Sequence, residues 1–160
     1  MAVKEGDKVP AGSFKVMTGD GPRDVSADEL FSGKTVAFFA LPGAFTPTCS
    51  AKHLPGFVQN AGALKAKGVD AIACSAANDV FVMAAWGKDQ RCEGKVEMLA
   101  DGSADFAKAM GLELDLGARG MGMRSQRYSM IVTDGTITRL NIEEPGAYEV
   151  SSVEHMLSQL

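Results

Sequence analysis

Several features that define other protein classes are absent from this sequence of 160 residues. No apolar run approaches the roughly 20 residues of a membrane span, and the stretch Met1–Asp7 lacks the apolar segment of a signal peptide. No run of lysine and arginine is long enough for a nucleic-acid or membrane-surface patch, and the net charge of -4 argues against binding to a phosphate backbone. We therefore expect no nucleic-acid partner and no membrane association.

Cysteine is scarce, with three residues in the chain. No Cys-x-x-Cys pair is present, which disfavours a dithiol exchange enzyme, and no His-x3-His pair accompanies the cysteines, so we expect no metal and no other cofactor. Three cysteines do not make a secreted disulfide framework. We therefore expect a reducing compartment, the cytoplasm, while an organellar location would require that a presequence has already been removed.

The length and the composition indicate an ordinary globular protein. A chain of 160 residues is expected to form a single domain, residues 1–160, and to bury about 70% of its unfolded surface without disulfides. The apolar fraction of 46% and the charged fraction of 22% are typical of such a domain.

Hydrophobic periodicity predicts strands and helices that alternate along the chain. Strands are predicted at 14–17, 35–41, 69–75 and 96–99, followed by a hairpin of 128–133 and 136–141 around Asp134-Gly135. Helices are predicted at 27–32, 48–67 with a kink at 51–55, 80–90, 104–110 and 152–160, and residues 112–125 are predicted to be irregular. This order predicts an α/β fold with a mixed central sheet and helices on both of its faces.

Serines with an N-cap pattern precede three of these helices. Ser26 with Glu29 and Ser151 with Glu154 match the capping box, and Ser103 is the expected cap of the helix at 104–110. Asn78 or Asp79 is the expected cap of the helix at 80–90.

The stretch from Leu41 to Ser50 joins the strand at 35–41 to the helix that begins near residue 48, and it contains Cys49. We expect Cys49 in the first turn of this helix, where free N–H groups and the helix dipole favour an anion. A thiol in such a place tends to ionise, and the thiolate is the reactive form. The alternative is a small buried apolar cysteine without chemistry.

The helix dipole alone is too weak to activate a thiol. An unperturbed cysteine has a pKa of about 8.5, and lowering it by about two units requires about 2.7 kcal/mol. The dipole contributes about 0.3–1 kcal/mol. A nearby cation or several hydrogen bonds are therefore needed, and Arg119, Arg124 and Arg127 are the candidates.

The residues around Cys49 carry a family resemblance. Pro42-Gly-Ala-Phe-Thr46-Pro-Thr-Cys49 has the Pro-x3-Thr-x2-Cys form of the peroxiredoxin active site. The chain resembles a type II peroxiredoxin, of the peroxiredoxin-five subfamily, over nearly all its length. Supporting stretches are Lys52–Phe57, Asn78–Met83, Trp86–Lys88, Gly111–Leu116 and Arg124–Met130.

This resemblance implies a thioredoxin-like fold and the reduction of hydrogen peroxide and organic hydroperoxides, with a role in redox homeostasis and defence against oxidative stress. Cys49 would be the peroxidatic cysteine that is oxidised to sulfenic acid. Thr46 would hold a peroxide oxygen, Pro42 would shield the site, and Arg127 would stabilise the thiolate. Arg124 is the competing arginine, with a solvated loop residue as its alternative.

The resemblance leaves the recycling of the sulfenic acid open. Cys74 matches the resolving candidate of plant- and microbe-type members, whereas Ser151 and Ser152 occupy the region of the animal-type resolving cysteine. If Cys74 is inert, glutaredoxin with glutathione, or thioredoxin, would act directly on Cys49. Cys92 is expected to be an exposed thiol at a helix end. A homodimer is implied, with the loops around the active site at its interface.

Other interpretations of Cys49 compete with the peroxidase. Cys49 could serve only as the switch of a redox sensor or a chaperone-like binding protein, or lie buried in a thioredoxin-fold interaction module. His53 lies four residues after Cys49, the spacing of one helical turn, so a Cys–His nucleophile and base is a further alternative. A histidine that is hydrogen-bonded within the helix or loop is favoured, and His53 is not counted among the site residues.

Overall fold

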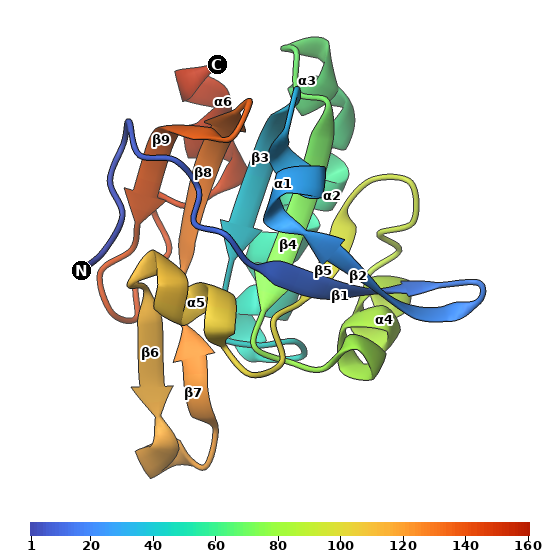
Figure 1. Ribbon diagram of the computed structural model, residues 1–160, viewed down its shortest axis with the longest axis vertical. Coiled ribbons are helices and arrows are strands. Elements are labelled where there is room, and N and C mark those ends of the chain that lie inside the picture. Colours follow the sequence, from blue (N-terminus) through green and yellow to red (C-terminus); the bar gives the residue numbers. More distant parts are fainter.

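Seven strands form a mixed sheet through the centre of the molecule (Figure 1). The computed structural model describes residues 1–160. The strand order is β2-β1-β5-β4-β3-β8-β9, with β3, β4 and β5 parallel and the other pairs antiparallel. The strands are β1 (Ser13–Thr18), β2 (Gly21–Ser26), β3 (Thr35–Ala40), β4 (Ala71–Ala76), β5 (Glu97–Ala100), β8 (Tyr128–Thr133) and β9 (Thr136–Ile142).

Helices cover both faces of this sheet (Figure 1). Ala37 and Phe39 of β3 belong to one buried cluster with residues of the helices on one face, whereas Val36 and Phe38 belong to a second cluster on the other. This alternation follows from the period of two residues along a strand. The first face carries η1 (Cys49–His53), α2 (Leu54–Gln59), α3 (Ala61–Ala66), α4 (Val80–Asp89) and α6 (Val153–Gln159), and the second carries α1 (Ala27–Phe31) and α5 (Asp105–Met110).

The central strands and the hairpin agree with the sequence prediction, and so does the mixed sheet with helices on both faces. Asp134 and Gly135 both have positive φ, 46° and 78°, as the tight turn between β8 and β9 requires. Ser26 caps α1 as predicted, because its hydroxyl accepts a hydrogen bond from the N–H of Glu29 at 3.0 Å. Asp79 caps α4 in the same way.

Three short strands were missed by the sequence prediction. β2 is a strand in which mostly polar, exposed residues pair with β1 alone, so it lacks a buried periodic face. Residues 112–125 are not irregular as predicted: they form β6 (Glu113–Leu116), the 3-10 turn η2 (Gly117–Arg119) and β7 (Gly122–Ser125). β6 and β7 pair only with each other and extend away from the central sheet (Figure 1), so neither strand has a buried face with a period of two residues.

Two of the predicted helix caps were wrong. The N-cap position of α5 is Ala104 and not Ser103, and the carboxylate of Asp101 accepts the N–H groups of Phe106 and Ala107 at 2.9 and 3.0 Å. α6 is capped by Ser152, which accepts from the N–H of His155, and not by Ser151. Ser151 is fully buried and bonds elsewhere.

The helix predicted at 48–67 is divided into three elements. Residues 49–53 form the π-helix η1, in which the N–H of Leu54 donates to the carbonyl of Cys49. Pro55 lies at the start of α2, where its missing N–H leaves few bonds unmade. A kink was predicted at 51–55, and the structure has the change from π-helix to α-helix between His53 and Leu54. Asn60 then separates α2 from α3. No helix is both long and apolar enough to cross a membrane.

Candidate active site

The chain that leaves β3 enters the site through a tight loop and the first turn of the following helix. The Thr46 hydroxyl donates to the carbonyl of Gly43 at 2.7 Å, and the Thr46 carbonyl accepts the N–H of Ser50 at 2.9 Å. Cys49 lies in this first turn, as predicted, and is completely buried. The indole of Trp86 donates to the Ser50 hydroxyl at 3.0 Å, which fixes the turn against α4.

Two side chains from distant segments hold this loop. Asn78 accepts the N–H of Ala44 at 2.8 Å, and Arg124 donates to the carbonyl of Pro42 at 3.1 Å. A Cβ at Gly43 would lie 2.5 Å from the Arg124 guanidinium, so a larger residue at this position would displace the end of the Arg124 side chain. Arg124 is half-buried and also donates to the carbonyl of Met121, so the alternative of a solvated loop arginine was wrong.

Arg127 is the arginine that reaches the sulfur. Its Nη2 donates to Sγ of Cys49 at 3.1 Å. The register of β8 against β3 explains this position, because Tyr128 pairs with Ala40, the last residue of β3. Arg127 therefore stands at the end of β3, where the chain leaves the sheet towards Cys49.

His53 is part of the same cluster, and the sequence interpretation left it out. It is fully buried at the end of η1, with Nε2 at 3.0 Å from the carbonyl of Ser151 and Nδ1 at 2.9 Å from Nη1 of Arg127. A carbonyl only accepts, so Nε2 carries the proton and Nδ1 accepts from the guanidinium. The signal in the sequence was the spacing of four residues between Cys49 and His53. Both residues lie on η1 and both contact the guanidinium of Arg127.

The environment keeps His53 neutral. Burial, and then the positive charge of Arg127, lower the pKa of His53 to about 3, although the hydrogen bond to Ser151 acts in the opposite direction. A neutral imidazole leaves Nδ1 free to accept from Arg127. His53 therefore contacts the guanidinium, and no hydrogen bond joins it to the sulfur of Cys49.

The other two cysteines are both buried, and all three thiols are free. Cys74 lies on β4 opposite Phe39 of β3 and belongs to the same buried cluster as Cys49. Burial raises the pKa of Cys74 well above its usual range. Cys92 follows α4 but is not exposed as predicted, and burial raises its pKa to about 11.

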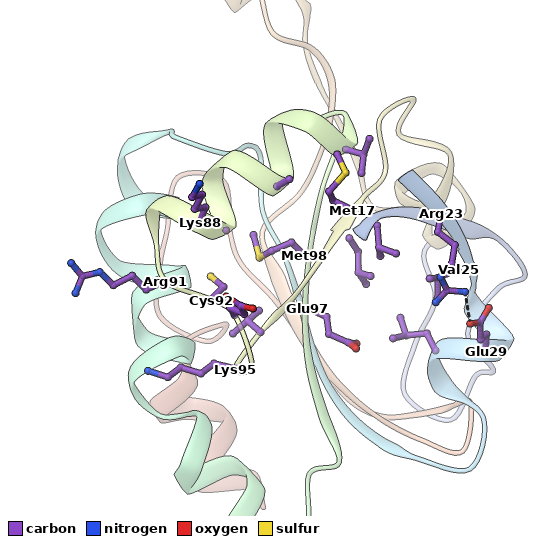
Figure 2. Close-up of a pocket in the computed structure, with 18 of the residues that line it drawn as sticks. Met17, Arg23, Val25, Glu29, Lys88, Arg91, Cys92, Lys95, Glu97 and Met98 are labelled. Carbon is purple, nitrogen blue, oxygen red and sulfur yellow. Dashed lines mark hydrogen bonds and ion pairs between the residues drawn. The ribbon is translucent and has the colours of Figure 1, made fainter. Parts of the chain in front are cut away.

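Cys92 lines a groove of about 910 Å³, which lies between the β1–β2 hairpin and the region of α4 and β5 (Figure 2). Met17 and Met98 contribute apolar surface there, and Arg91 and Lys95 extend from the segment after α4. Neither Cys49 nor Arg127 lines this groove, so it is separate from the cysteine site. No three side chains of His, Cys, Asp and Glu gather where they could bind a metal ion.

Comparisons with known proteins identify the family of the chain. The redoxin family profile matches residues 4–157. The chain is 46% identical to the chloroplastic peroxiredoxin-2E of Arabidopsis thaliana over 164 residues, which covers 99% of this chain and 70% of the relative. It is 45% identical to peroxiredoxin-2B of the same plant over 156 residues, covering 97% and 96%. The crystal structure of reduced Prx3 from Vibrio vulnificus, in complex with hydrogen peroxide, superposes with a TM-score of 0.95 at 48% identity and covers 98% of both chains.

The sheet, its helices and the family match place the chain among the redoxins, enzymes with a thioredoxin-like fold. Within that family it is a type II peroxiredoxin. The protein is accordingly a peroxidase that acts on a peroxide substrate.

The neutral state of His53 predicts a specific dependence of stability on pH. In the unfolded chain His53 binds a proton below about pH 6.5, whereas in the folded chain it binds one only near pH 3. Between these values protonation favours the unfolded chain, so the free energy of unfolding falls as the pH falls. The loss is up to about 1.4 kcal/mol per pH unit. Urea unfolding across this range should give a shallower decline for His53→Gln than for the wild type.

The matched control is His155→Gln, which changes the other histidine of the chain and should keep the wild-type decline. Parallel curves for the wild type and His53→Gln would contradict a neutral buried His53.

Proposed function

We propose that Cys49 is the peroxidatic nucleophile and that Arg127 stabilises its thiolate. The observation that carries this proposal is the contact of 3.1 Å between Nη2 of Arg127 and Sγ of Cys49. A guanidinium keeps its charge at physiological pH, and a hydrogen bond from a charged donor is about twice as strong as a neutral one. Together with the helix start, this contact supplies the stabilisation that the dipole alone lacks.

Thr46 and Pro42 would organise the substrate side of the site. The Thr46 hydroxyl donates to the carbonyl of Gly43, so its lone pairs remain able to accept the O–H of a hydroperoxide. Pro42 has no N–H to donate, and its carbonyl already accepts from Arg124, so its backbone would compete little with Thr46 for an incoming peroxide. Both residues are half-buried beside the completely buried Cys49.

In the proposed reaction the thiolate of Cys49 attacks the terminal oxygen of the hydroperoxide. The S–O bond forms as the O–O bond breaks, two electrons pass from sulfur to the peroxide, and Cys49 becomes a sulfenic acid. The leaving oxygen departs as hydroxide or alkoxide and takes a proton from water. Donors that face the developing charge accelerate such a step, and the guanidinium of Arg127 is placed to do so. Hydrogen peroxide and organic hydroperoxides both fit this chemistry.

An external thiol is the proposed reductant, delivered by glutaredoxin with glutathione or by thioredoxin. The reductant thiol attacks the sulfenic sulfur, water leaves, and a second thiol releases Cys49 from the mixed disulfide. Cys74 is the alternative resolving residue, but burial holds its thiol protonated on β4. A disulfide requires Cα atoms within about 7 Å in suitable orientation, so in that alternative the turn around Cys49 would unwind first.

We also propose a homodimer that uses the surface beside the site. Phe45, in the loop before Cys49, and Phe81, in the first turn of α4, are 54% and 66% exposed. Asn78 joins these two segments through its bond to Ala44, so both aromatic side chains belong to one region of the surface. Large exposed apolar side chains in one region are typical of an interface. The cytoplasmic location stays a prediction.

The assignment of Cys49 predicts the outcome of two cysteine substitutions. Cys49→Ser should abolish peroxide reduction, because a serine hydroxyl is not ionised at neutral pH. Cys74→Ser should leave the first oxidation unchanged, because that step needs only one sulfur. Stopped-flow peroxide consumption measures both, and fast reduction by Cys49→Ser would overturn the assignment.

Turnover of the wild type separates the peroxidase from a redox sensor. With glutaredoxin and glutathione, or thioredoxin, supplied, a peroxidase turns over repeatedly, whereas a sensor oxidises once and stops. Mass spectrometry of the peroxide-treated protein then shows whether Cys49 pairs with Cys74 or remains a sulfenic acid.

The contact with the sulfur predicts that Arg127→Lys slows the oxidation of Cys49 by about 10- to 100-fold, the equivalent of one charged hydrogen bond. Lysine keeps the charge but cannot contact Cys49 and His53 at once. Arg119→Lys is the control, because Arg119 is exposed in η2, and its rate should equal that of the wild type. An unchanged rate in Arg127→Lys would move the assignment to Arg124.

The proposed interface predicts that Phe81→Asp converts a dimer to a monomer in sedimentation velocity, because a carboxylate replaces an apolar contact. Phe81→Leu keeps an apolar side chain at the same position and should leave the dimer intact. A wild type that sediments as a monomer at high concentration would refute the interface.

A further inference from the structure

The segment between β9 and α6, residues 143–152, is organised around one carboxylate. Oε2 of Glu143 accepts three hydrogen bonds, from the N–H of Glu149 at 2.7 Å and from the N–H and the hydroxyl of Ser151 at 2.8 and 2.6 Å. Glu143 is 7% exposed and Ser151 is fully buried. Burial opposes ionisation, but these hydrogen bonds outweigh it and hold the pKa of Glu143 below its usual range.

Ser151 in turn is the partner of His53. Its N–H and hydroxyl both donate to Glu143, and its carbonyl accepts Nε2–H of His53 at 3.0 Å. This bond fixes which imidazole nitrogen carries the proton, and so it leaves Nδ1 as the acceptor for Nη1 of Arg127. The carboxylate is thus connected to the guanidinium through two intervening residues.

Glu143 also contacts Arg127 directly through the backbone. Its N–H donates to the carbonyl of Arg127 at 3.0 Å, immediately beyond the pairing of Tyr128 with Ile142. Arg127 is therefore held at its backbone by the N–H of Glu143, and at its guanidinium by the chain of bonds that starts at the carboxylate of the same residue. These four residues, Glu143, Ser151, His53 and Arg127, form a closed ring of hydrogen bonds.

Tyr148 of the same segment packs over the imidazole. Its ring lies 5.3 Å from that of His53 at an interplanar angle of 66°, and its hydroxyl donates to the carbonyl of Lys52 at 3.4 Å. The segment therefore restricts rotation of His53 as well as occupying one of its nitrogens.

We propose that Glu143 is a positioning residue of the peroxidatic site, which orients the guanidinium of Arg127 towards Cys49 through Ser151 and His53. A carboxylate suits this position because all its oxygen lone pairs accept and none of its atoms donates. A glutamine at the same place could turn its NH2 group towards the N–H of Glu149 and the N–H and hydroxyl of Ser151. An NH2 group cannot accept their hydrogen bonds. This inference rests on the proposed role of Arg127.

Glu143→Gln tests the proposal against Glu144→Gln, which makes the same change at the neighbouring, exposed carboxylate. We expect Glu143→Gln to slow stopped-flow oxidation of Cys49 by about 10-fold or more, the equivalent of one charged hydrogen bond. The rate of Cys49 alkylation by iodoacetamide at neutral pH should fall with it, because both reactions need the thiolate. Glu144→Gln should equal the wild type in both, and equal effects of the two changes would overturn the proposal.

Combination with Arg127→Lys distinguishes positioning from a structural role. If Glu143 acts through Arg127, adding Glu143→Gln to Arg127→Lys should slow oxidation by less than about 2-fold more, whereas independent effects multiply. Multiplication would overturn the proposal. A slow Arg127→Lys beside a normal Glu143→Gln would overturn this inference alone, and a normal Arg127→Lys would overturn the proposed function of Arg127.

Ser151→Ala keeps the inference testable if Glu143→Gln does not fold. It removes one of the three donors to the carboxylate but keeps the carbonyl that His53 contacts. We expect a fall in the oxidation rate that disappears in the Arg127→Lys background. An unchanged rate in Ser151→Ala would then overturn the proposal.

Discussion

The contact between the Arg127 guanidinium and the Cys49 sulfur is the interaction on which the rest of the site depends. Cys49 is completely buried, and burial by itself disfavours an anionic sulfur. The start of a helix offsets only a small part of that cost. In the proposed mechanism, the fixed positive charge of Arg127 at 3.1 Å from the sulfur supplies the remaining stabilisation. An arginine that was free to rotate would donate its hydrogen bonds to water or to a backbone carbonyl instead, as Arg124 does to the carbonyl of Pro42.

The fold meets this condition through strand register and loop contacts. Pairing of Ala40 with Tyr128 brings the start of β8 to the end of β3, so that Arg127 and the chain towards Cys49 emerge at the same edge. His53, on the same π-turn as the cysteine, then accepts from the guanidinium. The segment after β9 completes the arrangement from the other side through Glu143. Segments that are far apart in the sequence therefore meet at one planar side chain, which suits the several fixed donors of arginine.

Sequence analysis predicted the parts of this arrangement that depend on local pattern. The buried strand, the helix start at Cys49 and the Asp134-Gly135 turn follow from periodicity and turn chemistry, and the choice of Arg127 came from family resemblance. His53 was noted for its spacing of four residues from Cys49 but was left out of the site, because its partners Arg127 and Ser151 are distant in sequence. Glu143 was missed because its partners are also non-local and no local pattern distinguishes it from a surface residue. The wrong caps have the same origin. Ser151 fits a capping box, but the buried carboxylate of Glu143 takes its hydroxyl, and Ser152 caps α6 instead.

The π-turn joins activation of the cysteine to its regeneration. Cys49 begins η1 and His53 ends it, so both hydrogen bonds of the guanidinium end on this single turn. In the proposed cycle, the turn would open for the thiol reductant to reach Cys49, because the sulfur is completely buried. Opening it separates Arg127 from the sulfur and His53 from Ser151 together. Under the proposed mechanism, the ring that favours the thiolate would also oppose exposure of the oxidised cysteine, and its strength would set a compromise between rapid oxidation and access for the reductant.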